Sequence, residues 1–106
     1  MTVMREQIID EMALVIIDSQ RSARERGRLA MWTVYLRPTD FPDCYVARCF
    51  EVGDGAHQPA PTQAILRTIG DSDDELRMLR SAFCLGGMFC LDRALGDESH
   101  IVETWT

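Results

Sequence analysis

The residues that could carry chemistry in this chain are few, and two of them interrupt apolar faces. Arg48 alternates with apolar residues in the segment CYVARCFEV (44–52), and Glu103 lies between Ile101 and Trp105 near the end of the sequence. A charge on an otherwise apolar strand face must be paired or must line a pocket. We therefore expect Arg48 and Glu103 either to pair with each other or to mark a small concave ligand-binding surface. The aromatic residues expected around that surface are Trp32, Tyr35, Tyr45 and Trp105.

The two histidines are the candidates for acid–base work. His57 lies in a Gly- and Pro-rich stretch (53–61) that predicts a loop, and His100 precedes the last predicted strand. Nucleophilic catalysis needs a Cys or Ser beside a His that a carboxylate orients. Neither histidine has such a signature around it, so we expect a non-catalytic protein. The alternative is a small-ligand-binding or enzymatic domain that uses Arg48 and Glu103 with His57 or His100.

The four cysteines lack the spacing of a metal site. Zinc ligands usually come in pairs separated by two to four residues on a tight turn. Cys44 and Cys49 are five positions apart, on opposite faces of a predicted strand, and Cys84 and Cys90 are six apart. We expect reduced thiols, no metal and no cofactor. Because no signal-peptide pattern is present and the longest uncharged stretch (81–91) is too short to span a bilayer, we expect a cytoplasmic protein without membrane contact.

Composition and charge limit the kinds of molecule that we expect this protein to bind. The chain has 106 residues, of which 46% are hydrophobic and 26% charged, a profile typical of one globular domain. Residues 1–30 carry five arginines and five acids, so the whole net charge of −6 lies in residues 31–106. That excess argues against nucleic acid as a partner. An acidic regulator of a basic partner is a further alternative, with carboxylates from Asp71, Asp73, Asp74, Glu75, Asp92, Asp97 and Glu98 on one face.

The first 30 residues predict a helical arm, with one helix over 3–26 that ends at Gly27. Most of its apolar residues form one stripe, but Leu14 and Ile17 fall among the polar positions opposite. A helix that is apolar nearly all round is usually covered on two sides. We expect a second copy of the chain to cover the outer side, giving a homodimer, although a loop of the same chain is the alternative. The interface residues expected are Met4, Ile8, Met12, Leu14 and Ile17.

The remaining residues (31–106) predict a compact α+β body. Period-2 alternation favours an antiparallel pair of strands over 31–37 and 44–52, linked by a loop with two prolines. Residues 63–69 predict a third strand or a short helix. Ser72 and Glu75 form a capping-box pattern at the start of a helix that ends at Gly86-Gly87, and two last strands follow over 88–91 and 100–105. The expected order is α-β-β-β-α-β-β, with a small antiparallel sheet and one packed helix.

Two stretches of the body resemble a family of short uncharacterised bacterial proteins. The first has the pattern M-W-x-V-Y-x-x-P-x-D-F-P-x-x-Y-V-x-R over residues 31–48. The second has an acidic pair at Asp97-Glu98, followed by I-V-E-x-W at 101–105. The resemblance covers residues 31–106, and members tend to begin at the position of Met31, which makes the arm an addition. It implies a compact antiparallel α+β body and brings no known activity and no catalytic residues.

Overall fold

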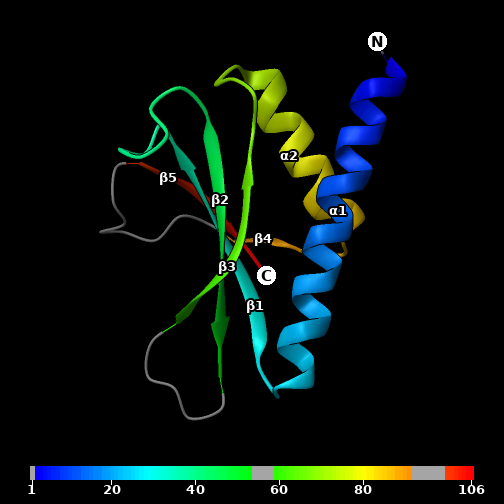
Figure 1. Cartoon of the computed structure of the whole chain (residues 1–106), viewed down its shortest axis with the longest axis vertical. Coiled ribbons are helices and arrows are strands. Elements are labelled where there is room, and N and C mark those ends of the chain that lie inside the picture. The colour runs from blue at the N-terminus through cyan, green and yellow to red at the C-terminus, as the bar shows by residue number, and fades with distance from the viewer. Residues whose placement is uncertain (1, 54–58, 92–99) are drawn as a thin grey trace.

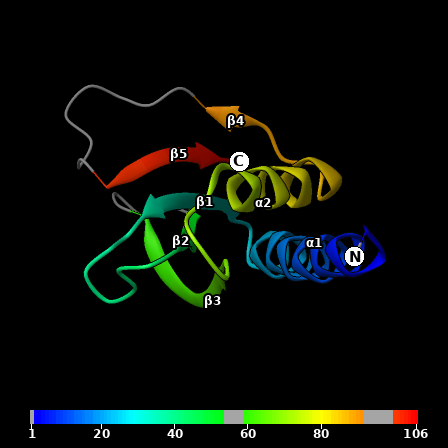
Figure 2. The same ribbon diagram turned by 90° about the horizontal axis from the view of Figure 1, so that it is seen from above.

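The computed structural model describes residues 2–53, 59–91 and 100–106. Its elements are α1 (Thr2–Glu25), β1 (Leu29–Leu36), β2 (Tyr45–Val52), β3 (Ala60–Arg67), α2 (Asp73–Leu85), β4 (Cys90–Leu91) and β5 (Ile101–Trp105). The predicted α+β class and element order are confirmed, and the segment left open between strand and helix is strand β3. Figure 1 shows the two helices beside the sheet, and Figure 2 shows both on the same face of it.

The five strands form one sheet in the order β3-β2-β1-β5-β4, with antiparallel neighbours throughout. Strand β1 is central, and its residues fix which side chains share a face. Val34 lies opposite Ala47 of β2 and opposite Glu103 of β5. Its neighbour Thr33 lies opposite Arg48, on the other face. Because successive side chains alternate between faces, Glu103 points to the helix layer and Arg48 points away from it.

Helix α1 ends in a Schellman motif at Gly27. Gly27 has a φ of +69°, a left-handed conformation that glycine adopts without a Cβ penalty. The Gly27 N–H donates to the carbonyl of Arg24, and the Arg28 N–H donates to the carbonyl of Ala23 at 2.8 Å. These two bonds satisfy carbonyls at the helix end and turn the chain directly into β1.

Helix α2 begins after Ser72, which has the extended backbone of an N-cap residue. The predicted capping box is wrong in its side-chain part, because the Ser72 hydroxyl makes no capping hydrogen bond. Instead, the N–H groups of Glu75 and Leu76 donate to the Ser72 carbonyl, and acids at 73–75 lie in the first turn, where the helix dipole favours negative charge.

The core lies between the sheet and the two helices, and both parts of the chain contribute to it. Met12, Ile16 and Ala23 of α1 belong to the same buried cluster as Trp32 of β1 and Phe83 of α2. Residues 1–30 and 31–106 thus share one hydrophobic core. Where the helices meet, Ile16 is fully buried against Gly86, and the Gln20 amide donates to the Gly86 carbonyl at 2.8 Å. Within the described part of the chain, no helix combines the length and the hydropathy needed to cross a membrane.

Candidate functional site

Glu103 is a buried carboxylate with a full set of donors from its own chain. It lies on β5 with 6% of its surface exposed. The Arg80 guanidinium of α2 donates to its Oε1 from Nε at 3.0 Å and from Nη2 at 2.7 Å, and the Trp105 indole N–H donates to Oε2 at 2.7 Å. These bonds to Glu103 raise the pKa of Arg80. Trp105 in turn stacks on Phe83, with 5.0 Å between ring centroids. The arrangement fastens α2 to the sheet.

A second buried carboxylate, Glu51 on β2, fastens the end of α1 in the same way. Arg26, just beyond the helix, forms a two-point ion pair with Glu51. The Nη1 atom of Arg28 lies 3.6 Å from Oε1 of Glu51. The hydrogen bonds from Arg26 hold the pKa of Glu51 below its usual value. This cluster was not predicted from the sequence. The sequence shows only that two arginines, Arg26 and Arg28, lie at the end of the first helix. That pattern does not identify Glu51, 25 positions after Arg26, as their partner.

Arg48 and Glu103 lie on opposite faces of the sheet, so the hypothesis that they pair is wrong. Arg48 instead forms an ion pair with Asp40 of the β1–β2 loop, at the surface. Strand alternation correctly placed each residue on an apolar face of its own strand. It could not relate the two faces, because that depends on the order β2-β1-β5, with a strand between them.

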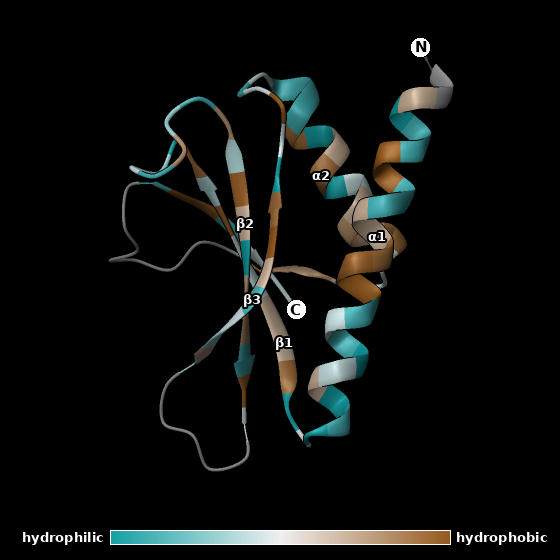
Figure 3. Ribbon diagram, viewed as in Figure 1, coloured by the Kyte–Doolittle hydropathy of each residue, from teal (hydrophilic) through white to brown (hydrophobic). Residues whose placement is uncertain are grey.

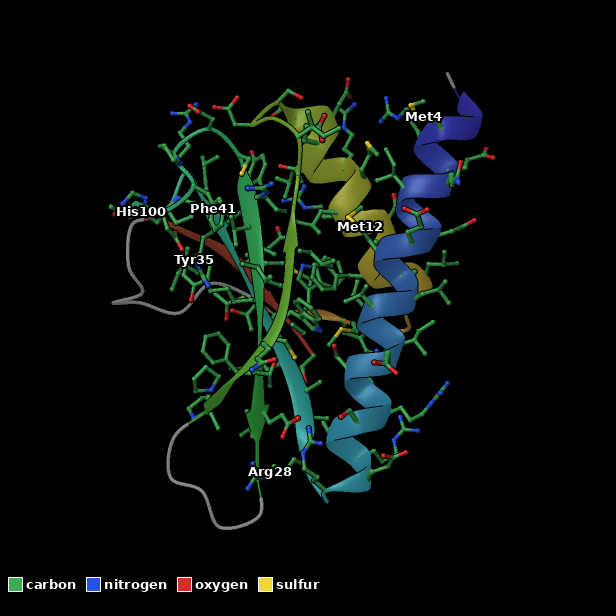
Figure 4. All side chains as sticks on the ribbon, in the orientation of Figure 1. Met4, Met12, Arg28, Tyr35, Phe41 and His100 are labelled. Carbon is green, nitrogen blue, oxygen red and sulfur yellow. The ribbon has the colours of Figure 1, made fainter. Side chains whose placement is uncertain are left out.

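The aromatic residues expected around one concave surface are divided between the two faces. Trp32, Tyr45 and Trp105 are buried on the helix side, and Trp32 is fully enclosed. Tyr35 is half-buried and lies, with Phe41 and His100, on the side away from the helices (Figure 4). The predicted binding surface of Arg48, Glu103 and these four rings is therefore not assembled as one site.

His100 joins no catalytic group among the described residues. His100 is exposed, and its Nδ1 lies 3.2 Å from the carbonyl oxygen of Leu36, a contact that holds the start of β5 against β1. His57 lies outside the described residues. Of the alternative enzymatic set, Arg48 pairs with Asp40, Glu103 pairs with Arg80, and His100 contacts the Leu36 carbonyl.

The four cysteines are thiols and divide into two pairs. Cys44 and Cys49 are buried, and burial raises the pKa of both, which keeps them neutral and weakly nucleophilic. Cys84 and Cys90 are exposed. In the part of the chain that the structure describes, no three His, Cys, Asp or Glu side chains gather as metal ligands.

The acidic residues of the regulator alternative are partly neutralised. Asp71 pairs with Arg37 at 2.7 Å, and Asp74 pairs with Arg77 at 3.2 Å. The remaining described members are Asp73 and Glu75 in the first turn of α2. Asp92, Asp97 and Glu98 lie outside the described residues.

A cavity of about 340 Å³ opens where the N-terminal half of α1 meets α2 and the end of β3. Met4, Ile8 and Met12 line it from α1, Met78 from α2 and Ile69 from the segment between β3 and α2. In Figure 4, Met12 lies between the helices and Met4 lies near the N-terminal end of α1. Arg5 and Arg67 line this cavity with positive charge, and Asp74 and Glu75 line it with negative charge. This cavity was not predicted from the sequence, because it arises from the way two helices and a strand end come together.

The outer face of α1 is the largest departure from an ordinary solvated helix. Leu14 is 66% exposed and Ile17 is 37% exposed, although both lie in the middle of the helix. Figure 3 shows that this middle part is strongly hydrophobic, whereas the last turns are mostly hydrophilic. The residues predicted to form the interface therefore differ in their exposure. Met4, Leu14 and Ile17 are exposed, while Ile8 is half-buried and Met12 is buried in the chain's own core.

Comparison of the chain with models of protein families, with curated proteins and with solved structures found no match. The resemblance of residues 31–106 to a bacterial family stays a prediction.

Proposed function

We propose that this protein is a non-catalytic interaction domain that self-associates through helix α1 as a homodimer. The observation that carries the proposal is the two-sided burial pattern of this helix. Ile16 on its inner side is fully buried, whereas Leu14 on its outer side keeps 66% of its surface exposed. Single exposed apolar residues are common on protein surfaces. Here, Leu14 and Ile17 stand one helical turn apart on a continuous helix, so one partner surface can cover both.

The charge distribution and the contacts of the polar residues support a non-catalytic role. The buried carboxylates Glu51 and Glu103 are each held by arginines of the same chain, in structural ion pairs. The thiols that burial leaves neutral, Cys44 and Cys49, are poor nucleophiles. The exposed thiols Cys84 and Cys90 favour a reducing compartment, and the proposal therefore places the protein in the cytoplasm.

The test is the mass of the full-length chain in solution, measured by sedimentation over a wide range of protein concentration. We expect a dimer that becomes monomeric in the double variant L14E/I17E. The matched control is V15E, because Val15 is 39% exposed on the same helix but points about 100° away from Leu14. Circular dichroism checks that the variants fold. A wild-type chain that stays monomeric at all concentrations, or a V15E variant that dissociates as fully as L14E/I17E, contradicts the proposal.

The cavity beside Met12 favours a second candidate function, the binding of a small apolar molecule that carries an anionic group. Five methionine and isoleucine side chains line it, and neither Arg5 nor Arg67 forms an ion pair with any described residue. Of the two carboxylates in the lining, Asp74 is paired with Arg77, which leaves Glu75 against the two arginines. Titration with the fluorescent anion anilinonaphthalene sulfonate tests this function. We expect saturable binding that weakens in R5E and is unchanged in R24E, which alters the charge elsewhere on α1. Equal binding by both variants contradicts this candidate.

A further inference from the structure

Six exposed residues form a stripe along the outer face of α1, on the side opposite its buried residues. Their spacing alternates between three and four positions, which is the heptad spacing of helices that pair in coiled coils. We call this set the outer stripe, and its members are Gln7, Asp10, Leu14, Ile17, Arg21 and Arg24. The residues that α1 buries in its own core, Met12, Ile16 and Ala23, occupy the opposite heptad positions. The helix therefore presents one face to its own fold and a second, regularly spaced face to solvent.

The outer stripe is self-complementary when it is read in reverse. If two copies of α1 pack antiparallel about a two-fold axis between Val15 and Ile16, Leu14 meets the partner's Ile17 in the two central layers. In the next layers, Asp10 meets the partner's Arg21, which joins opposite charges. In the outermost layers, Gln7 meets the partner's Arg24. A two-fold interface requires this reciprocity, since each contact must occur twice.

We propose that two copies of this chain dimerise through an antiparallel pairing of the outer stripes, centred between Val15 and Ile16 and flanked by reciprocal Asp10–Arg21 ion pairs. The inference rests on the proposed function and specifies its geometry. The charged members are available for it, because neither Asp10 nor Arg21 makes an ion pair or side-chain hydrogen bond with any described residue.

Charge separates the antiparallel pairing from the parallel one. In a parallel pair, each layer joins identical residues, so Asp10 faces Asp10, Arg21 faces Arg21 and Arg24 faces Arg24. Three like-charge layers would then surround only two apolar ones. The antiparallel pair replaces two of those repulsions with attractions and keeps the apolar contacts. Like charges placed opposite each other disfavour wrong pairings more strongly than favourable pairs stabilise the right one.

Acidic residues on one side of the outer stripe repel each other in the proposed dimer, and this repulsion limits the affinity of the two copies. Glu11 and Asp18 lie beside the stripe, and the antiparallel arrangement brings Glu11 near the partner's Asp18. The stripe extends over residues 7–24, about 27 Å of helix, and contains only two apolar residues per chain. We therefore expect a concentration-dependent dimer rather than a permanent one. Neutralising the flank in E11Q should tighten the dimer about two- to five-fold.

Cross-linking tests the direction of the pairing on the full-length chain. In a C84S/C90S background, which removes the exposed thiols, D10C and R21C are prepared separately and treated with a short bismaleimide, alone and as a mixture. The antiparallel pair places position 10 beside position 21 of the partner, whereas the two copies of position 10 lie about 16 Å apart along the helices. We expect cross-linked dimers in the mixture and few in either variant alone. The mixed dimer also keeps one Asp10–Arg21 ion pair.

A charge-reversal cycle tests the specific ion pair by sedimentation. D10R alone places arginine against arginine in the antiparallel dimer, and we expect the dissociation constant to rise about ten-fold or more. R21D alone should have a similar effect. The double variant D10R/R21D restores opposite charges across the axis and should return the dissociation constant to within about three-fold of the wild-type value.

The outcomes distinguish this geometry from the proposed function. A wild-type chain that is monomeric contradicts both. A dimer that L14E/I17E dissociates, but whose D10C and R21C variants each cross-link alone at least as efficiently as the mixture, contradicts the antiparallel pairing and leaves self-association standing. A double variant D10R/R21D that is as weak as the single variants contradicts the ion pair. Thermal melts of each variant confirm that the fold is retained, since all the substituted residues are exposed.

Discussion

Helices α1 and α2 lie side by side on one face of the sheet, yet their outer faces differ. On α2, an exposed ion pair between Asp74 and Arg77 lies near the start of the helix, Arg80 reaches down to the sheet, and only Leu85 in the last turn is a large exposed apolar residue. On α1, the middle of the outer face exposes Leu14 and Ile17. Each helix is nevertheless fastened to the sheet by an arginine on a buried glutamate, Arg26 on Glu51 and Arg80 on Glu103.

The difference shows that the contacts that hold a helix on the sheet do not determine which side chains its outer face exposes. The arginine–glutamate pairs and the apolar inner faces hold both helices on the sheet, so exposed Leu14 contributes little to the fold of the single chain. The proposed dimer would cover this side chain. Four experiments follow from this comparison, ordered by the size of the expected effect.

The inner and outer faces of α1 should respond very differently to truncation. Ile16→Ala removes methyl groups from a fully buried site and should lower the free energy of unfolding by about 2–5 kcal/mol. Leu14→Ala, on the exposed face, should change it by less than about 0.5 kcal/mol. Urea denaturation at low protein concentration, where dimers dissociate, measures both. Similar losses for the two variants would mean that the faces are not distinct.

The contact between the two helices depends on the absence of a side chain at Gly86. Its backbone is in the right-handed helical region, so alanine adds no backbone strain. A Cβ there would lie 2.8 Å from Cγ2 of Ile16, however, and G86A should cost about 1–3 kcal/mol by overpacking. The cost should shrink when I16A is combined with G86A, because the space is then free. Additive effects in this double-mutant cycle would rule out the steric cause.

The anchor of α1 predicts a pH dependence. Arg26 lowers the pKa of Glu51, and a carboxyl whose pKa is depressed by folding stabilises the fold above its unfolded pKa of about 4.3. That contribution disappears as the pH falls through the folded pKa. Glu51→Gln should therefore lower the free energy of unfolding near neutral pH and have little effect in acid. Glu6→Gln, at an exposed position of α1, is the control and should show no such pH-dependent difference.

The smallest effect concerns the thiols, which report on the two helices without altering them. Cys84 of α2 and Cys90 of β4 are exposed, whereas Cys44 and Cys49 are buried in the sheet, with a pKa that burial raises. A chromogenic disulfide reagent should label two thiols rapidly and the other two only after unfolding. Rapid reaction of Cys49, which belongs to the core between the sheet and the helices, would show that the helix layer opens easily.

Local patterns in the sequence predicted most of the fold. The alternation of large apolar and polar residues in β1 and β2 fixes their faces, and Gly27 ends α1 because its left-handed backbone suits glycine. The exposure of Leu14 and Ile17 could be predicted, because the regular period of an α-helix places both residues on the face opposite its main apolar stripe.

The partners of the charged residues could not be predicted in the same way. Glu103 was correctly placed on an apolar face, but its partner Arg80 comes from α2, and the direction of that helix over the sheet is a tertiary property. The same holds for Arg48, whose partner Asp40 lies in a loop that folds back over the outer face. The cavity beside Met12 depends on three elements at once. Each of these needed the packed structure.

The edge strand β3 bears on how the protein avoids uncontrolled assembly. Its outer edge offers eight residues of backbone to any passing strand, and open edges of that kind are where sheets of different molecules join into fibres. Pro61 removes one donor from this strand, and the register slips where it meets β2, between Arg48 and Phe50. Because of both features, the edge of β3 is poorly suited to pairing with a further strand. These features disfavour the joining of sheets of different molecules along this edge.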